Sequence, residues 1–307
     1  MNYTYYIADV FTNQIFSGAQ IAVFPSAEEL SLEQMELVAR ELNLSETVFL
    51  AQKEGVENHY IMKIFTPRGE RDFAGQTIIA AGYVLAACGN KLPVGEAHTT
   101  VIFEQNTGKI QASISHSEGK ASFIQFARTV SPVVDYYVPT DNELAGFLGI
   151  NQAHIDTKKY ATRLVSCDVP YLVVPVYYYE AVRDAVFNFS AWSQSSAPQT
   201  AAQEILLVSP KTPYQDSDFA ARLVGPNIGA HEDPPVGSAI PALAAYLCSF
   251  DHMQKGTYTF AVQRGDDKMR RSILNLEMDH KGEDTLNLRV GGEAVMAAEG
   301  TMFIPKI

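Results

Sequence analysis

The chain has 307 residues, of which 47% are hydrophobic and 19% charged, a balance typical of a well-packed globular protein rather than a disordered one. Its formal net charge of −12 argues against nucleic acid as a partner, because phosphate binding needs concentrated Lys and Arg. The cysteines, Cys88, Cys167 and Cys248, are odd in number and lack metal-type spacing, so neither a zinc site nor a disulfide framework is indicated.

The sequence also carries no sign of a membrane or export segment. The N-terminus passes directly into a strand-like run without the charged-then-apolar pattern of a signal peptide. The longest apolar stretches, Thr77 to Cys88 and Ala239 to Phe250, are too short to span a bilayer. We therefore expect a soluble, cytoplasmic protein with no membrane partner, no metal and no other cofactor.

The first half of the chain opens with strand-like runs at residues 4–11 and 21–24. A helix is then predicted after Ser31-Leu32-Glu33-Gln34, because Ser31 and Gln34 can satisfy each other's free N–H groups in a capping box. Strands are predicted at 46–52 and 60–66 and, beyond an apolar run, at 99–104, 109–115 and 121–126.

The second half repeats this order, beginning with another capping box at Thr140-Asp141-Asn142-Glu143. Residues 128–138 are the candidate boundary, which gives lobes of residues 1–127 and 128–307, with the last strand able to return to the first lobe. Ser193 to Gln203, rich in Ser, Gln and Ala, is predicted as an exposed loop. Strands are predicted at 171–176, 204–208 and 219–224 and, beyond a second apolar run, at 257–263, 272–278 and 285–290.

The two apolar runs match each other at a constant offset, since Gly75-Gln76-Thr77-Ile78 opens the first and Gly237-Ser238-Ala239-Ile240 the second. A helix that is apolar on all sides belongs in a core, so two such helices predict a duplicated architecture with two lobes. Helix N-termini carry unpaired N–H groups and partial positive charge, which suit anionic substrate groups. Each run follows an acidic residue, Asp72 in the first and Asp233 in the second. If both helix N-termini face one cleft near these carboxylates, the arrangement favours an enzyme.

Each half is predicted to be a curled, mostly antiparallel sheet around one apolar helix. The strands do not alternate with helices as a doubly wound sheet requires, so the fold class is α+β. Neither a glycine-rich dinucleotide fingerprint nor a phosphate-binding loop occurs, so nucleotide binding has no support.

Several motifs resemble one known family. Asn43-Leu44-Ser45-Glu46-Thr47, Phe65-Thr66-Pro67, Phe73-Ala74-Gly75 and Glu232-Asp233-Pro234 with Gly237-Ser238-Ala239 fall in the order seen in PhzF-like proteins, relatives of the phenazine-biosynthesis isomerase. The resemblance covers nearly the whole chain. It implies the diaminopimelate epimerase-like fold, in which two pseudo-symmetric lobes, each a barrel-like sheet around a helix, have the active site between them. It also implies a homodimer.

The resemblance assigns roles to individual residues. It implies that Glu46 is the proton-transferring acid/base, that Asp233 assists, and that Gly75, Gly237 and Ser238 hold the substrate. Such chemistry needs a carboxylate whose pKa is raised toward neutrality, which a partly desolvated cleft can supply. Where the family usually has Gly-His-Pro-Thr, this chain has Gln76 in place of the His, and an amide can hydrogen-bond but cannot exchange a proton.

The leading hypothesis is a cofactor-independent isomerase in which Glu46 moves a proton on a small carboxylated substrate, positioned by Asp233 and Gln76. One alternative is an amino-acid racemase or epimerase of the same fold, which needs two opposed bases, usually thiols. However, Cys88 lies at the far end of its predicted helix, about 18 Å from Gln76 at 1.5 Å per residue. The other alternative is a non-catalytic binder that lost the usual active-site His. Asp233 and Ser238 also have a simpler interpretation as helix caps.

Overall fold

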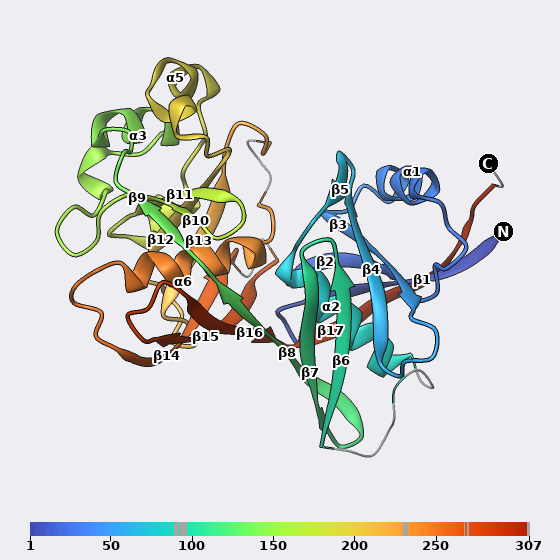
Figure 1. Cartoon of the computed structure of the whole chain (residues 1–307). Helices are drawn as coiled ribbons and strands as arrows, with labels where there is room; N and C mark the ends of the chain where they lie inside the picture. The colour runs from blue at the N-terminus through green and yellow to red at the C-terminus, as the bar shows by residue number, and fades with distance from the viewer. Residues whose placement is uncertain (89–91, 93–96, 230–232, 267, 269, 306–307) are drawn as a thin grey trace. The chain divides into compact units, whose positions relative to one another are not determined.

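The computed structural model describes residues 1–88, 92, 97–229, 233–266, 268 and 270–305. The chain divides into two compact units (Figure 1). The first unit contains Met1–Arg128, Arg270–Ser272 and Arg289–Ile307, and the second contains Thr129–Met269 and Ile273–Leu288. Among the described residues, no helix is long and apolar enough to cross a membrane.

The first unit is a mixed sheet in which most pairings are antiparallel. Strand β17 pairs with β1, and the sheet continues through β2, β3, β4, β6, β7 and β8. Only β2–β3 and β4–β6 are parallel among these pairs. The elements are β1 (Asn2–Val10), β2 (Ala19–Phe24), α1 (Leu32–Leu42), β3 (Glu46–Gln52), β4 (His59–Thr66), β5 (Gly69–Arg71), α2 (Gly75–Ala87), β6 (His98–Gln105), β7 (Gly108–Ser117), β8 (Lys120–Val130) and β17 (Ala294–Phe303).

The second unit is built in the same way, with a run of paired strands from β9 through β10, β11, β12 and β13 to β14. Its elements are β9 (Val133–Asp135), α3 (Asp141–Leu148), η1 (Gln152–His154), β10 (Arg163–Ser166), β11 (Pro170–Pro175), α4 (Tyr179–Arg183), α5 (Phe189–Gln194), η2 (Ala197–Thr200), β12 (Glu204–Ser209), β13 (Phe219–Val224), η3 (Gly237–Ala239), α6 (Ile240–Cys248), β14 (Gly256–Arg264), β15 (Ser272–His280) and β16 (Leu286–Gly292), the last of which continues into the first unit.

The predicted duplication is visible in the strand pairings of the two units. From β1 to β6 the successive pairings of β1, β2, β3, β4 and β6 are antiparallel, parallel, antiparallel and parallel. The run β10, β11, β12, β13 and β14 has the same sequence of directions. In each unit an apolar helix lies in the chain between the last two strands of this run, which pair in parallel. This helix is α2 in the first unit and α6 in the second. The two apolar runs are therefore equivalent elements of one repeated fold.

Helix α2 forms the centre of the first unit because it has almost no polar face. Ile78, Ile79 and Val84 are fully buried, and the helix packs against β1, β2, β3, β7 and β17. Figure 1 shows it surrounded by the strands of its unit. Helix α6 is equally apolar and packs against β10 and β11, with Pro241 in its first turn, where a missing N–H costs no hydrogen bond.

Local signals predicted most elements, and both capping boxes, at Ser31 and at Thr140, are confirmed. One prediction is confirmed only in part, because Ser193 to Gln203 is mostly exposed but is not all loop. It contains the end of α5 and the short helix η2, and Ala197, Thr200 and Ala202 are buried. Small residues in this segment allow close packing, and a composition rich in Ser and Gln does not indicate that any of them is buried.

Candidate functional site

The predicted acid/base, Glu46, is the first residue of β3. Its neighbour across the parallel pairing is Ile21 of β2, and the antiparallel pairing with β4 begins one residue later. The side chain is almost wholly enclosed, with only 4% of the residue exposed. A carboxylate so placed requires polar partners, because an isolated buried charge is very costly.

Gln76, the second residue of α2, supplies one such partner. Its Nε2 donates a hydrogen bond of 2.8 Å to Oε1 of Glu46, and Gln76 itself is 1% exposed. Its own Oε1 has no hydrogen-bond partner among the described residues. The N-terminus of α2 begins at the buried Gly75, and its N-cap, Ala74, has no capping side chain. The structure thus brings together three predicted residues, Glu46, Gln76 and Gly75, at a helix N-terminus.

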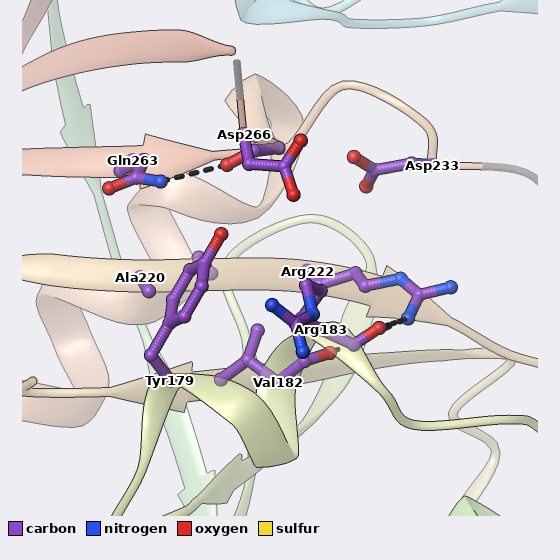
Figure 2. Close-up of a pocket in the computed structure, with 10 residues that line it drawn as sticks. Tyr179, Val182, Arg183, Ala220, Arg222, Asp233, Gln263 and Asp266 are labelled. Atoms are coloured by element: carbon purple, nitrogen blue, oxygen red, sulfur yellow. Dashed lines mark hydrogen bonds between the residues drawn. The ribbon is translucent and has the colours of Figure 1, made fainter. Parts of the chain in front are cut away.

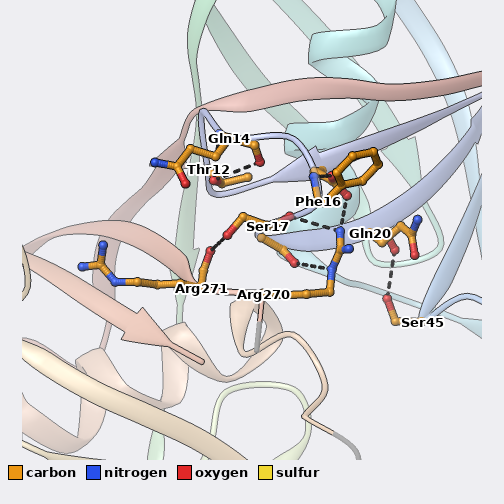
Figure 3. A network of polar contacts seen from close by, with 10 residues as sticks. Thr12, Gln14, Phe16, Ser17, Gln20, Ser45, Arg270 and Arg271 are labelled. Carbon is orange, nitrogen blue, oxygen red and sulfur yellow. Dashed lines mark hydrogen bonds and ion pairs between the residues drawn. The ribbon is translucent and has the colours of Figure 1, made fainter. Parts of the chain in front are cut away.

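A polar network holds the chain that precedes this site (Figure 3). Asp9, at the end of β1, is fully buried, accepts a 2.7 Å hydrogen bond from the N–H of Phe16 and forms an ion pair with Arg270. Burial raises the pKa of Asp9, while the Phe16 N–H and Arg270 oppose that rise. Ser45, next to Glu46, donates to the carbonyl of Gln20 at 3.3 Å. The network therefore fixes the loop between β1 and β2 and the strand start that carries Glu46.

In the second unit, Asp233 lies between β13 and η3, and its side chain is also buried. The exposed fraction of its side chain is 8%, and its Oδ2 lies 3.1 Å from Nε of Arg264, the last residue of β14, which is 7% exposed. Burial raises the pKa of Asp233, while the positive charges of Arg264 and Arg222 oppose that rise. The cap interpretation of Asp233 is wrong, because its carboxylate forms an ion pair instead.

Asp233 also lines a pocket within the second unit (Figure 2). The carboxylates of Asp233 and Asp266 turn toward each other across it, and the hydroxyl of Tyr179 points toward them from the start of α4. Arg222 donates from Nη1 to the backbone carbonyls of Arg183 and Ala185 at 2.6 and 3.0 Å, so it closes one wall. Sequence reasoning missed Arg222 and Arg264, because no local motif contains them.

Gly237 and Ser238 open the second apolar run as predicted, but not as a helix cap. Gly237 is buried and begins η3, while the N-cap of α6 is Ala239, which makes no side-chain capping bond. The buried hydroxyl of Ser238 has no hydrogen-bond partner within the part of the chain that the structure describes. The cap interpretation of Ser238 is therefore wrong.

The cysteines do not occupy the positions of acid/base thiols. Cys88 is the C-cap of α2 and hydrogen-bonds to Tyr6, whose pKa is raised to about 12 mainly by burial. Cys248 is the last residue of α6, and burial raises the pKa of its thiol to about 11. Both thiols thus lie at the helix ends opposite to Gln76 and Ser238. Glu232, the first residue of the Glu-Asp-Pro motif, lies outside the described residues.

Comparison with known proteins identifies the family. The model of the family described as phenazine biosynthesis-like protein (PhzC-PhzF) matches residues 8–300. The chain belongs to this PhzF family. An uncharacterized isomerase of Mesorhizobium japonicum is 30% identical, with 98% of each chain covered. A trans-2,3-dihydro-3-hydroxyanthranilate isomerase of Pseudomonas chlororaphis is 24% identical, with 98% of this chain and 99% of that protein covered.

A solved structure shows the same fold. The phenazine biosynthesis protein of the PhzF family from Bacillus anthracis matches with a TM-score of 0.85 and 20% identity, covering 99% of this chain and all of that one. The expected fold class, α+β with two curled sheets of mostly antiparallel strands around apolar helices, is thereby confirmed. At the level of the PhzF family, the expectation of an enzyme of the isomerase class is confirmed as well.

Proposed function

We propose that this PhzF-family chain is a cofactor-independent isomerase that moves a proton on a small carboxylated substrate, with Glu46 as general acid/base. The observation that carries the proposal is the buried Glu46 carboxylate, held by the Gln76 amide beside the N-terminus of α2. A fixed carboxylate in a site shielded from water suits proton transfer at carbon, because its partners are already oriented.

The chemistry follows from the types of groups available. Glu46 would remove a proton from a carbon beside an activating group and return it to another carbon of the same substrate, so that no atom is gained or lost. Backbone N–H groups at the start of α2 would stabilise the negative charge that develops in between. Gln76 cannot exchange a proton, so Glu46 would carry it in both directions as a single base.

The remaining predicted residues complete the proposal. Asp233 would assist from the second unit, and Gly75, Gly237 and Ser238 would bind the polar groups of the substrate. That all of them serve one substrate in one cleft is part of the proposal, and it derives from the family resemblance. The unpartnered hydroxyl of Ser238 supports a ligand contact, because buried polar groups are normally hydrogen-bonded.

The first test is incorporation of solvent deuterium into trans-2,3-dihydro-3-hydroxyanthranilate, the substrate in the name of one relative, and into a panel of small carboxylated analogues. Label that appears with the wild type and not with Glu46→Gln supports the proposal. Glu36→Gln is the matched control, because Glu36 lies on an exposed face of α1 beside Arg40 and should leave labelling unchanged. Wild-type rates of labelling in Glu46→Gln would refute the assignment.

The two alternative functions make different predictions. A thiol-dependent racemase would lose activity on substitution of Cys88 or Cys248, which the positions of these residues do not favour. A non-catalytic binder would retain ligand affinity in Glu46→Ala and would label no compound. The homodimer that the resemblance implies is tested by sedimentation, where a monomer at all working concentrations would contradict it.

A further inference from the structure

The ion pair behind Asp233 has no role in the reaction as proposed so far. Asp233 precedes η3 and Arg264 ends β14, so two separate segments of the second unit bring them together. Both side chains are more than nine-tenths buried, and the two facing atoms, Nε and Oδ2, are 3.1 Å apart. Burying a pair of charges has a large desolvation cost, and apolar residues of similar size often serve stability as well or better. Stability alone is therefore a weak reason for this pair.

The two oxygens of Asp233 have different surroundings. Oδ2 faces Arg264, whereas Oδ1 is buried and has no hydrogen-bond partner among the residues that the structure describes. Asp233 lines the pocket, but Arg264 does not. Arg264 thus holds the carboxylate from outside the pocket and leaves one oxygen for whatever enters it. A buried acceptor without a partner beside a pocket indicates a ligand that donates a hydrogen bond.

The other charged and titratable groups near the pocket do not replace Arg264. Arg222 of β13 contributes positive charge, but its Nη1 is engaged by backbone carbonyls, including that of Arg183. Asp266, after β14, adds negative charge and so opposes ionisation of Asp233. Tyr179 and Arg183 of α4 complete the polar lining, together with Gln263 of β14. Arg264 is therefore the main cation that keeps a buried carboxylate charged beside a second carboxylate.

We propose that Arg264 is a positioning residue of the isomerase: it fixes Oδ2 of Asp233, keeps that carboxylate ionised, and so presents Oδ1 to a hydrogen-bond donor of the substrate. The proposal rests on the proposed function, because it assigns Asp233 to the reacting complex. It predicts that loss of Arg264 changes the ionisation of Asp233 as well as the packing around it.

The first experiment needs no substrate. Side-chain carboxyl carbons of aspartate, labelled with ¹³C, are titrated by NMR in the full-length protein, and Asp233 is assigned by the signal lost in Asp233→Asn. We expect the midpoint for Asp233 to rise by about one pH unit or more in Arg264→Met and Arg264→Gln, since each removes an adjacent opposite charge. Arg264→Lys should largely restore it. Arg183→Met is the matched control and should leave the Asp233 midpoint unchanged, because Arg183 also lines the pocket but pairs with Asp184.

The second readout is the pH profile of deuterium exchange. In Arg264→Gln the acidic limb of kcat/KM should move upward with the NMR midpoint, and Arg264→Lys should move it back. Two neutral variants guard against one that fails to fold, and the fluorescence of Trp192, which lies buried in the same unit, checks folding. An unchanged Asp233 midpoint in both neutral variants would overturn the proposal, as would a shifted midpoint with an unchanged pH profile. The proposed function fails separately, if Glu46→Gln exchanges deuterium as fast as the wild type, whatever the Asp233 midpoint does.

Discussion

The hydrogen bond between Gln76 and Glu46 allows a quantitative test of the site in the first unit. Gln76→Leu keeps the approximate size of the side chain but removes the donor that contacts Oε1 of Glu46 at 2.8 Å. A hydrogen bond to a charged group contributes about 1.5–3 kcal/mol to the free energy of unfolding. The substitution also removes the buried Oε1 of Gln76, which has no partner among the described residues. Removing this atom should offset about 1 kcal/mol of the lost stability. We therefore expect a net loss of about 1–2 kcal/mol.

A double-mutant cycle separates the bond from other effects. Gln76→Leu, Glu46→Leu and the double variant should give a coupling energy of about 1.5–3 kcal/mol, because each single variant leaves one buried polar group without its partner. Gln34→Leu is the comparison, since buried Gln34 donates its Nε2 to the neutral carbonyl of Pro305 at 2.8 Å. Its coupling to Glu46 should be near zero.

The assay must report on the first unit. The single tryptophan, Trp192, lies in the second unit, so its fluorescence does not follow the surroundings of Glu46. Urea unfolding followed by far-UV circular dichroism gives the free energies, and hydrogen exchange in β3 and α2 shows where the loss occurs. A coupling energy below about 0.5 kcal/mol, or a Gln76→Leu protein as stable as the wild type, would show that this hydrogen bond does not stabilise the fold.

Three further predictions concern the structure around the sites. Arg270→Met leaves Asp9 buried without its cation and should lower the free energy of unfolding by about 3–5 kcal/mol at neutral pH, measured by urea unfolding. This loss of stability should shrink as pH falls, because a protonated Asp9 needs no cation. A loss that does not depend on pH would contradict the prediction. Gly18→Ala should cost about 2 kcal/mol or more, since Gly18 has a φ of +66° and an added Cβ would lie 2.4 Å from the carbonyl oxygen of Val10; an unchanged unfolding midpoint would show that the loop adapts. The backbone N–H groups of Thr140 and Ser196 lower the pKa of Glu143, so its carboxylate stabilises the fold above the ordinary value of 4.5, and that contribution is lost as pH falls below it. Glu143→Gln should flatten the acid limb of stability followed by tryptophan fluorescence, and an unaltered limb would exclude this role.

Sequence patterns predicted the elements that depend on interactions between residues close together in the chain. The capping boxes at Ser31 and Thr140 depend on residues three positions apart, so the sequence alone reveals them. The apolar helices α2 and α6 were also predictable, because burial on all sides leaves a composition without a polar face. Strand β17 was not predicted, since most of its side chains are exposed or half-buried and its pairing with the distant β1 determines its conformation.

The site was predictable only in part. The family resemblance supplied Glu46, Gln76 and Asp233, but no pattern in the sequence shows that Gln76 donates to Glu46, because the packing of α2 against β3 creates that contact. The pairing of Asp233 with Arg264 joins residues from separate segments, and a charged residue at a strand end gives no local sign of its partner. Such long-range polar contacts become visible only once the chain is folded.

Proton transfer on carbon by Glu46 can be followed by the incorporation of solvent deuterium. Wild type, Glu46→Gln and Glu36→Gln are incubated in D₂O with the panel of carboxylated compounds, and mass spectrometry follows the label. We expect label in at least one compound with wild type and Glu36→Gln, and loss of that label in Glu46→Gln. Equal labelling by wild type and Glu46→Gln would contradict this expectation.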